Sequence, residues 1–246
     1  MDNVNDFLKI YRGEDFYLTD KIHIRQPDIN EICNYGEQRY WATLFAIVST
    51  PFDMIAQLNN IGIDFITITD FQLFVLLSRG LHTDETSIFF GDLDFQKAKV
   101  IENKEDNSIS LVWRDGRILN QYTYQVMAKY LRTIHNIPKP KYTKVANEFT
   151  KQKMIEVAQY KFERDKRVKG KQKSILLPLI SSLINHPAGK YNHDTVWNLK
   201  IYAFFDSIKR IGALENANHL YTGVYSGCVD FEKIDKKELD WMRELS

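Results

Sequence analysis

Apolar residues recur at three- and four-residue steps along much of the chain, which is the spacing of a helix with one buried face. In the first segment this spacing runs from Ile29 to Ile47 and predicts one helix that ends near Ser49. The sequences at 50–53 and 69–70 each place a threonine ahead of an acidic first turn, a pattern typical of helix starts. They predict two shorter helices, each of which ends at the next glycine.

The pattern changes to short apolar runs between Ser87 and Leu119. The runs lie at 87–90, 98–101 and 109–113, and the two later gaps hold turn-forming residues at 103–107 and 115–116. Short apolar runs bounded by such turns are typical of strands in hairpins. We therefore predict a small antiparallel sheet near residues 87–119. A further short strand is expected at 22–24, where apolar and polar residues alternate.

Helical spacing resumes after the predicted sheet. It predicts helices from Asn120 to His135 and from about Thr143 to Arg167, two more over 174–214, and a last one that starts with a capping pattern at 235–238. The predicted fold class is α+β and mostly helical, with a small antiparallel sheet near residues 87–119 and a helical C-terminal domain.

Charge divides the chain into three segments. Residues 1–137 carry 13 basic and 19 acidic side chains, residues 138–173 carry 12 and 4, and residues 174–246 carry 8 and 9, so the formal net charge of +1 is a sum over unlike parts. Pro138 and Pro140 interrupt helix formation at the first boundary, because proline lacks a donor and restricts the residue before it. We predict an acidic α+β domain with a β-hairpin insertion at 1–137, a basic connector and long helix at 138–173, and a helical C-terminal domain at 174–246.

Composition indicates a globular protein. The 246 residues are 44% hydrophobic and 26% charged, which excludes disordered and low-complexity classes. The two cysteines, Cys33 and Cys228, are too few and too far apart for a disulfide framework or a thiolate zinc site. The N-terminus lacks a signal-peptide pattern, and no apolar run approaches the roughly 20 residues that span a bilayer. We expect an intracellular protein without a membrane partner.

The sequence contains no pattern of a known catalytic, nucleotide or metal site. HExxH, GxSxG and P-loop patterns are absent, and Cys33 lies on an apolar helix face, where a buried structural cysteine is expected. His193 and Asp194 fit a helix-start turn better than a catalytic dyad, although an enzyme site assembled from them and distant acids is an alternative. Paired acids fit turns and caps better than a two-metal nuclease site. We predict a non-enzyme without cofactor or metal. The acidic pairs are Glu14 with Asp15, Asp84 with Glu85, and Asp92 with Asp94.

A basic stretch at 161–173 is the strongest local charge feature. Its side chains could bind phosphates, an acidic protein partner or the acidic first segment, and Glu163 and Asp165 lie within helical reach of its lysines. Only Tyr160 and Phe162 add aromatic rings, so a stacking platform for single strands is not predicted. The candidate binding residues are Lys161, Arg164, Lys166, Arg167, Lys169, Lys171 and Lys173.

Two stretches carry a family resemblance. Residues 20–40, in which a strand leads through Gln26-Pro27 into an acidic and aromatic helix, resemble the opening of small phage tail-morphogenesis proteins, including tail assembly chaperones. Residues 184–241 resemble the C-terminal half of phage proteins from Gram-positive hosts. The second resemblance rests on Asn185-His186-Pro187, Tyr191-Asn192, Trp197, Lys209-Arg210-Ile211, the residues from Leu220 to Gly227, and Asp240-Trp241.

The resemblance implies a non-enzymatic phage tail assembly or structural protein, either chaperone-like or a tail or baseplate component. Its partners would be phage tail or tape-measure proteins, and it would reside in the cytoplasm of the host cell or be retained in the virion. An alternative function is that of a nucleic-acid-binding accessory protein that uses residues 161–173. Aromatics dominate interface hot spots, but a position in the buried core is expected for most of the candidates. The candidate interface aromatics are Tyr17, Tyr40, Trp41, Tyr191 and Trp197.

Overall fold

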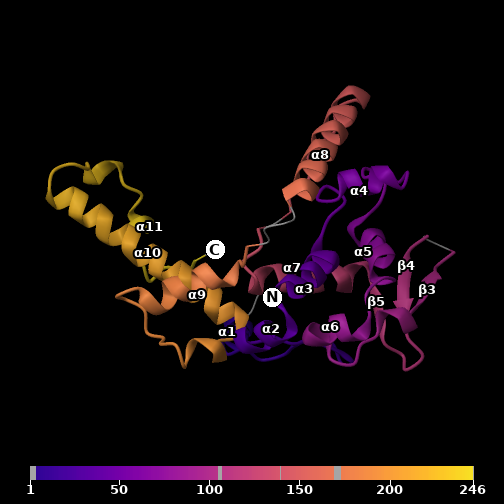
Figure 1. Ribbon diagram of the computed structural model, residues 1–246, viewed down its shortest axis with the longest axis horizontal. Coiled ribbons are helices and arrows are strands. Elements are labelled where there is room, and N and C mark those ends of the chain that lie inside the picture. Colours follow the sequence, from indigo (N-terminus) through magenta and orange to yellow (C-terminus); the bar gives the residue numbers. More distant parts are fainter. Residues whose placement is uncertain (1–3, 105–106, 139, 169–172, 246) are drawn as a thin grey trace. The chain divides into compact units, whose positions relative to one another are not determined.

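The computed structural model describes residues 4–104, 107–138, 140–168 and 173–245, and its contacts divide the chain into two compact units (Figure 1). One unit, here termed the central unit, comprises Asp15–Arg25 and Glu31–Ser174. The other, the C-terminal unit, comprises Met1–Glu14, Gln26–Asn30 and Ile175–Ser246. Long-range contacts, rather than neighbourhood in the sequence, therefore define the second unit.

Helices dominate the central unit, and two small antiparallel sheets accompany them, which confirms the predicted α+β class. Its helices are α3 (Glu37–Val48), α4 (Ile55–Asn60), α5 (Asp70–Ser78), α6 (Thr83–Phe90), α7 (Gln121–Ile134) and α8 (Glu148–Val168), and α2 (Ile29–Tyr35) runs into it from the preceding segment. A 3-10 turn covers Phe95–Lys97. The largest buried side chains are aromatic: Tyr40, Phe71, Phe74, Phe89, Phe90, Phe95, Tyr124 and Tyr130.

The predicted small sheet is confirmed between residues 99 and 120. It consists of β3 (Lys99–Glu102), β4 (Ile109–Val112) and β5 (Ile118–Asn120), all antiparallel, and β1 (Phe16–Thr19) pairs with β2 (Ile22–Ile24) in a separate sheet. Leu111 opposes Leu119, and both are fully buried. The indole of Trp113 donates to the carbonyl of Asp94 at 2.7 Å. One face of the sheet is thereby fixed to the core.

The strand predicted at 87–90 is wrong, because these residues end helix α6. The backbone N–H of His82 donates to the carboxylate of Glu85 at 2.9 Å, which fixes the helix start. Ile88, Phe89 and Phe90 are all buried, so the run shows neither strand nor helix periodicity. Periodicity alone cannot separate a buried strand from a buried helix end.

The helix predicted from Ile29 to Ser49 is interrupted by Gly36, whose φ of 99° separates α2 from α3. Glycine accepts this conformation without a side-chain clash. The buried face of α2 is formed by Ile29 and Ile32, and Cys33 next to them is exposed, so the prediction of a buried cysteine is wrong.

The next predicted helix also starts later than expected. The carboxylate of Asp53 accepts hydrogen bonds from the backbone N–H and the hydroxyl of Thr50, both at 2.8 Å. These bonds form a turn ahead of α4, which begins at Ile55. By contrast, the starts of α5 and α7 are confirmed, with Thr69 and Asn120 as N-caps.

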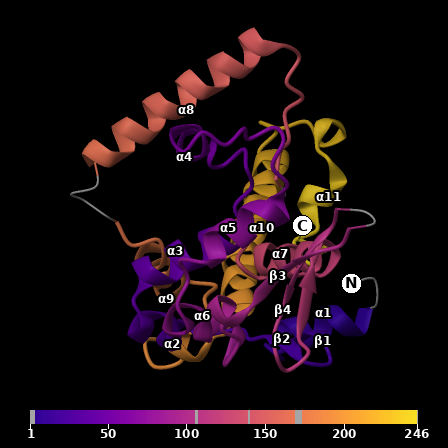
Figure 2. The same cartoon turned by 90° about the vertical axis from the view of Figure 1, so that its right-hand side faces the viewer.

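Helix α8 lies alongside α4 (Figure 2). Ile155 of α8 joins a buried cluster with Ile55, Leu58, Phe65 and Leu73. At the start of the helix, Lys151 pairs with Asp64 at 2.8 Å and holds the pKa of that carboxyl below its usual range. The long helix predicted by the sequence is therefore attached along its first half to the central unit.

The C-terminal unit is helical, as predicted, but includes residues from the start of the chain. It consists of α1 (Val4–Tyr11), α9 (Leu176–Asn185), α10 (Ile201–Tyr225) and α11 (Lys236–Leu239), with 3-10 turns at Val196–Asn198 and Phe231–Lys233 (Figure 1). Ile29 donates its N–H to the carbonyl of Leu199 at 3.1 Å, and Ile201 donates to that of Pro27 at 3.0 Å. In the described parts of the chain, no helix combines the length and apolar character needed to cross a bilayer.

Candidate binding pocket

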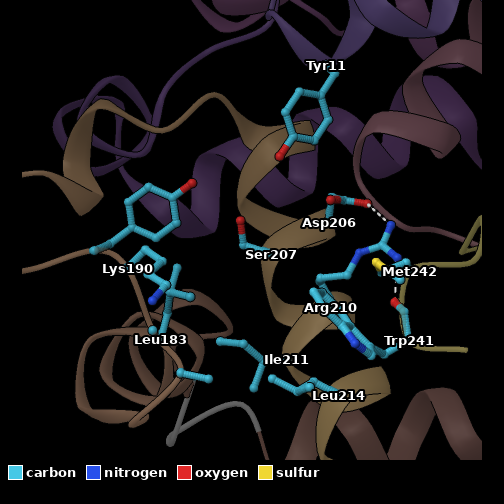
Figure 3. A pocket seen from close by; sticks show the side chains of 13 residues that line it. Tyr11, Leu183, Lys190, Asp206, Ser207, Arg210, Ile211, Leu214, Trp241 and Met242 are labelled. Carbon is cyan, nitrogen blue, oxygen red and sulfur yellow. Dashed lines mark hydrogen bonds and ion pairs between the residues drawn. The ribbon is translucent and has the colours of Figure 1, made fainter. Parts of the chain in front are cut away.

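The C-terminal unit contains a cavity of about 610 Å³ between the end of α1, the loop after α9, the middle of α10 and the segment after α11 (Figure 3). One end is polar and the other apolar, as Figure 3 shows: Tyr11, Asp206 and Ser207 lie opposite Leu183, Ile211 and Leu214. The lining residues are Tyr11, Leu183, Ala188, Gly189, Lys190, Tyr191, Asp206, Ser207, Arg210, Ile211, Leu214, Trp241 and Met242.

The apolar end results from helix periodicity. Asp206, Ser207, Arg210, Ile211 and Leu214 follow one another at steps of one and three residues, so they share one face of α10. Leu183 is buried on the facing side of α9, whereas Met242 is 72% exposed at the cavity edge. Covering apolar surface at a cavity mouth with a ligand favours binding, because it removes that surface from water.

Arg210 holds the segment after α11 against α10. One of its guanidinium nitrogens donates to the carbonyls of Trp241 and Arg243, both at 2.7 Å. Another lies 4.0 Å from the carboxylate of Asp206, one turn earlier on the same helix. The guanidinium is thus committed to positioning Trp241 at the edge of the cavity.

Tyrosine hydroxyls surround the polar end. Tyr11 meets the ring of Tyr202 edge to face, with the ring centroids 6.3 Å apart. Burial raises the pKa of Tyr11, and the negative charge of Asp206 and the neighbouring Tyr191 raise it further. The pKa of Tyr202 is raised by the same causes, burial and then Asp206. Both phenols stay protonated at neutral pH, and that of Tyr11, which lines the cavity, can donate a hydrogen bond to a ligand.

Ser207 is engaged within its own helix: its hydroxyl donates to the carbonyl of Ala203 at 2.7 Å. The described residues of the cavity lining include neither histidine nor cysteine. Within the described ranges, no group of three His, Cys, Asp or Glu side chains could hold a metal ion. A cavity with an apolar floor and a few polar groups at one end is suited to binding.

Gly189 brings the loop after α9 close to the helix end. A Cβ at this position would lie 2.3 Å from the carbonyl oxygen of Leu183 and 2.9 Å from that of His186. The absence of a side chain lets Lys190 and Tyr191 reach the cavity. On the other side of this loop, His186 lies 3.5 Å from the carboxylate of Glu215 on α10.

The predicted basic residues Lys161, Arg164, Lys166 and Arg167 lie exposed on α8, far along the helix from its anchored start. Two of them have acidic neighbours: Lys166 pairs with Glu163 at 2.9 Å and Arg164 with Asp165 at 3.0 Å. Lys173 is also exposed. Lys169 and Lys171 lie outside the described residues. Binding by this stretch stays a prediction.

The structure separates the predicted interface aromatics into two groups. Tyr40 and Trp41 are core residues of the central unit, with exposed fractions of 0% and 8%, so the interface interpretation is corrected for both. They occupy the inner face of α3, where a helix shows the same apolar spacing for a core as for an interface. Tyr17 is exposed, and Tyr191 and Trp197 are half-buried. Of these, Tyr191 lines the cavity.

His193 and Asp194 belong to a turn. The side-chain oxygen of Asn192 accepts from the backbone N–H of Asp194 at 3.0 Å and from that of Thr195 at 2.9 Å. The ring of His193 stands edge to face against Trp197, with the centroids 5.9 Å apart. This geometry matches the turn interpretation rather than a catalytic dyad.

Sequence reasoning did not identify the cavity. Of its lining only Tyr191 is a predicted interface residue, and Arg210, Ile211 and Trp241 occur with it in the stretch that carries the second resemblance. The sequence does not predict Tyr11 as a cavity residue, because its position near Asp206 depends on the packing of α1 on α10.

Residues 169–246 match a family model described as the YomV second domain, which is a phage-associated domain family. The match covers less than half of the chain and contains every residue of the cavity lining except Tyr11. No curated protein and no solved structure matches the chain.

Proposed function

We propose that this chain is a non-enzymatic phage protein of tail assembly, which acts by binding another protein through the cavity of its C-terminal unit. The observation that carries the proposal is the division of the cavity into an apolar floor and a polar end where Arg210 and Ser207 already hydrogen-bond within the unit. Arg210 is bound to two carbonyls and Ser207 to a third. The phage-associated match over 169–246 supports the phage context.

The partner inserts an apolar side chain over Leu183, Ile211 and Leu214, and a backbone or side-chain acceptor meets the phenols at the polar end. Tyr11, Tyr191 and Trp241 surround this site, and tyrosine and tryptophan are enriched among residues that dominate binding energy. The proposed partners are tail or tape-measure proteins, met in the cytoplasm of the host cell.

The proposal is tested by filling the cavity. Leu214→Trp places an indole on its floor, whereas Asn218→Trp adds the same side chain one turn later at an exposed position of α10. Tagged wild-type and variant chains are purified from infected cells, and the accompanying proteins are identified by mass spectrometry. Tail proteins are expected with the wild type and with Asn218→Trp, and should be lost with Leu214→Trp.

Two results would contradict the proposal. One is that no virion or tail-assembly protein accompanies the wild-type chain. The other is that Leu214→Trp retains the same partners as Asn218→Trp while circular dichroism shows both to be folded. Mass spectrometry of purified virions then decides whether the protein stays in the finished particle.

A further inference from the structure

The central unit has a second concave surface, which lies outside the segment that matches the phage domain. It consists of two adjoining hollows of about 620 and 680 Å³, which share Phe52, Asp53, Ile55 and Met154. The first follows α4 and α8, and the second continues toward Phe45 at the end of α3. Here we term the two hollows together the α8 groove.

One face of α8 forms a wall of this groove. Its lining positions are Thr150, Lys153, Met154, Val157, Ala158, Lys161, Phe162 and Asp165, which recur at steps of one and three residues. They extend over about four turns, or about 23 Å. Met154 and Ala158 pack against the cluster around Ile55, but Val157 beside them is 54% exposed. An apolar strip therefore runs along a helix that is covered on one side only.

The charges at the groove are mainly basic. Its lining contains four basic residues and two acidic ones, Asp53 and Asp165. The carboxylate of Asp53 accepts a hydrogen bond from the backbone N–H of Thr50 at 2.8 Å, and that of Asp165 accepts one from the guanidinium of Arg164 at 3.0 Å. In the described part of the chain, the side chains of Lys141 and Lys161 have no hydrogen-bond or ion-pair partner, whereas Lys153 pairs with Glu156 at 2.7 Å and Arg132 donates to the carbonyl of Val48. The basic residues are Arg132, Lys141, Lys153 and Lys161.

We propose that the α8 groove binds an amphipathic helix of a partner protein, with carboxylates beside its apolar stripe. The apolar stripe would cover Phe52, Met154 and Val157, as in other helix-in-groove complexes. Lys153 and Lys161 stand eight residues apart on α8, about 12 Å along its axis. Acidic residues seven or eight positions apart on the bound helix would meet the ammonium group of Lys161 and compete with Glu156, which pairs with Lys153 at 2.7 Å, for the other.

Nucleic acid fits this surface less well than an acidic helix. Phosphates would pair with the lysines but leave the apolar strip around Met154 and Val157 exposed to water. The apolar floor between the basic side chains is what favours a protein helix.

The test uses the full chain and two fluorescent helical peptides of about 18 residues, which is about five turns. Both peptides carry leucines at three- and four-residue spacing. One has glutamates beside the stripe at seven- and eight-residue spacing, and the other has lysines at the same positions. Fluorescence anisotropy should show that the glutamate peptide binds about tenfold more tightly, the combined effect of a few solvent-exposed charge pairs.

Charge reversal inside and outside the groove provides the matched control. Lys161→Glu should remove the preference for the glutamate peptide, because it places a carboxylate at the wall of the groove. Arg167→Glu makes the same change on α8 at an exposed position outside the lining and should keep the preference. Leu214→Trp should also bind the peptide like the wild type, so this test is independent of the C-terminal cavity.

Three results would overturn the inference. They are no binding of either peptide by the folded chain, equal affinity for both peptides, and an equal loss of preference in Lys161→Glu and Arg167→Glu. A labelled duplex oligonucleotide serves as a further probe. If it binds more tightly than the glutamate peptide and Lys161→Glu abolishes that binding, the groove is a nucleic-acid surface instead.

Discussion

His135 is a buried titratable residue whose charge is controlled by the fold. Its Nδ1–H donates to the carbonyl of Leu131 at 2.6 Å, and its Nε2 accepts from the hydroxyl of Tyr40. The rings of Trp41 and Phe89 lie around it at centroid distances of 5.9 and 6.0 Å. Burial lowers the pKa of His135 to about 4 and raises the pKa of Tyr40 well above its usual range. Both side chains are therefore neutral in the folded protein.

This burial predicts a loss of stability in mild acid. The unfolded chain takes up a proton on His135 near its ordinary pKa of 6.5, whereas the folded chain does so only near 4. The stabilisation is complete above about pH 6.5 and is lost as pH falls toward 4, by about 3 kcal/mol. Urea unfolding at about pH 7 and about pH 4.5 should show this difference for the wild type.

Removing the titrating group should reduce that pH dependence. His135→Gln is expected to be less stable at neutral pH but to lose less on acidification, while the exposed His219→Gln should behave like the wild type. A proton NMR titration gives a second measure, since the His135 imidazole should remain neutral at about pH 5. An imidazolium there in the folded state would refute the assignment.

At the scale of elements, two glycines of the C-terminal unit should respond oppositely to alanine. Gly189→Ala brings a methyl group to 2.3 Å from the Leu183 carbonyl oxygen and should lower the free energy of unfolding by about 1–3 kcal/mol. Gly212 lies inside α10 with no atom within 4 Å of a Cβ, so Gly212→Ala should raise stability by about 0.5–1 kcal/mol. Chemical unfolding followed by circular dichroism measures both changes.

The opposite signs make this pair its own control, because both changes add one methyl group to the same unit. A Gly189→Ala variant as stable as the wild type would mean that the loop after α9 can move away from the helix end. A destabilised Gly212→Ala variant would mean that the surface of α10 at this point is covered.

Elements with local signals could be predicted from the sequence, and those fixed by packing could not. Thr69 and Asn120 predict the starts of α5 and α7, because each side chain accepts a hydrogen bond from the backbone N–H three residues later. The helical end of α6 at Phe90 lies among buried residues on all sides, and the break at Gly36 rests on a single glycine inside an otherwise helical pattern. An apolar run that is buried on all sides has lost the alternation that separates a helix from a strand.

At the scale of the whole molecule, the fold joins the two ends of the sequence into one unit. The backbone bonds from Ile29 to Leu199 and from Ile201 to Pro27 link residues about 170 positions apart. Charge distribution and proline positions do not indicate which distant segments pair with each other. The sequence therefore does not predict that Tyr11 lines the cavity. The segment 169–246 that matches the phage domain accordingly lacks part of the unit to which it belongs.

Because α1 and α10 belong to one unit, a substitution in the core of α1 should lower the stability of α10. Ile10 is 3% exposed, its carbonyl accepts from the buried side chain of Gln26 at 2.9 Å, and α1 packs on α10. Ile10→Ala should destabilise the C-terminal unit by about 2–5 kcal/mol, the range for truncating a buried isoleucine. Hydrogen exchange with mass spectrometry should then show faster exchange in α9 and α10, with α7 of the central unit less affected.

Leu8→Ala is the matched control, because Leu8 lies on the same helix and is 59% exposed. It should leave the exchange of α10 unchanged. If Ile10→Ala accelerates exchange in α7 as much as in α10, the two units unfold together and the contacts do not mark independent stability. If it changes neither, α1 contributes no stability to the C-terminal unit.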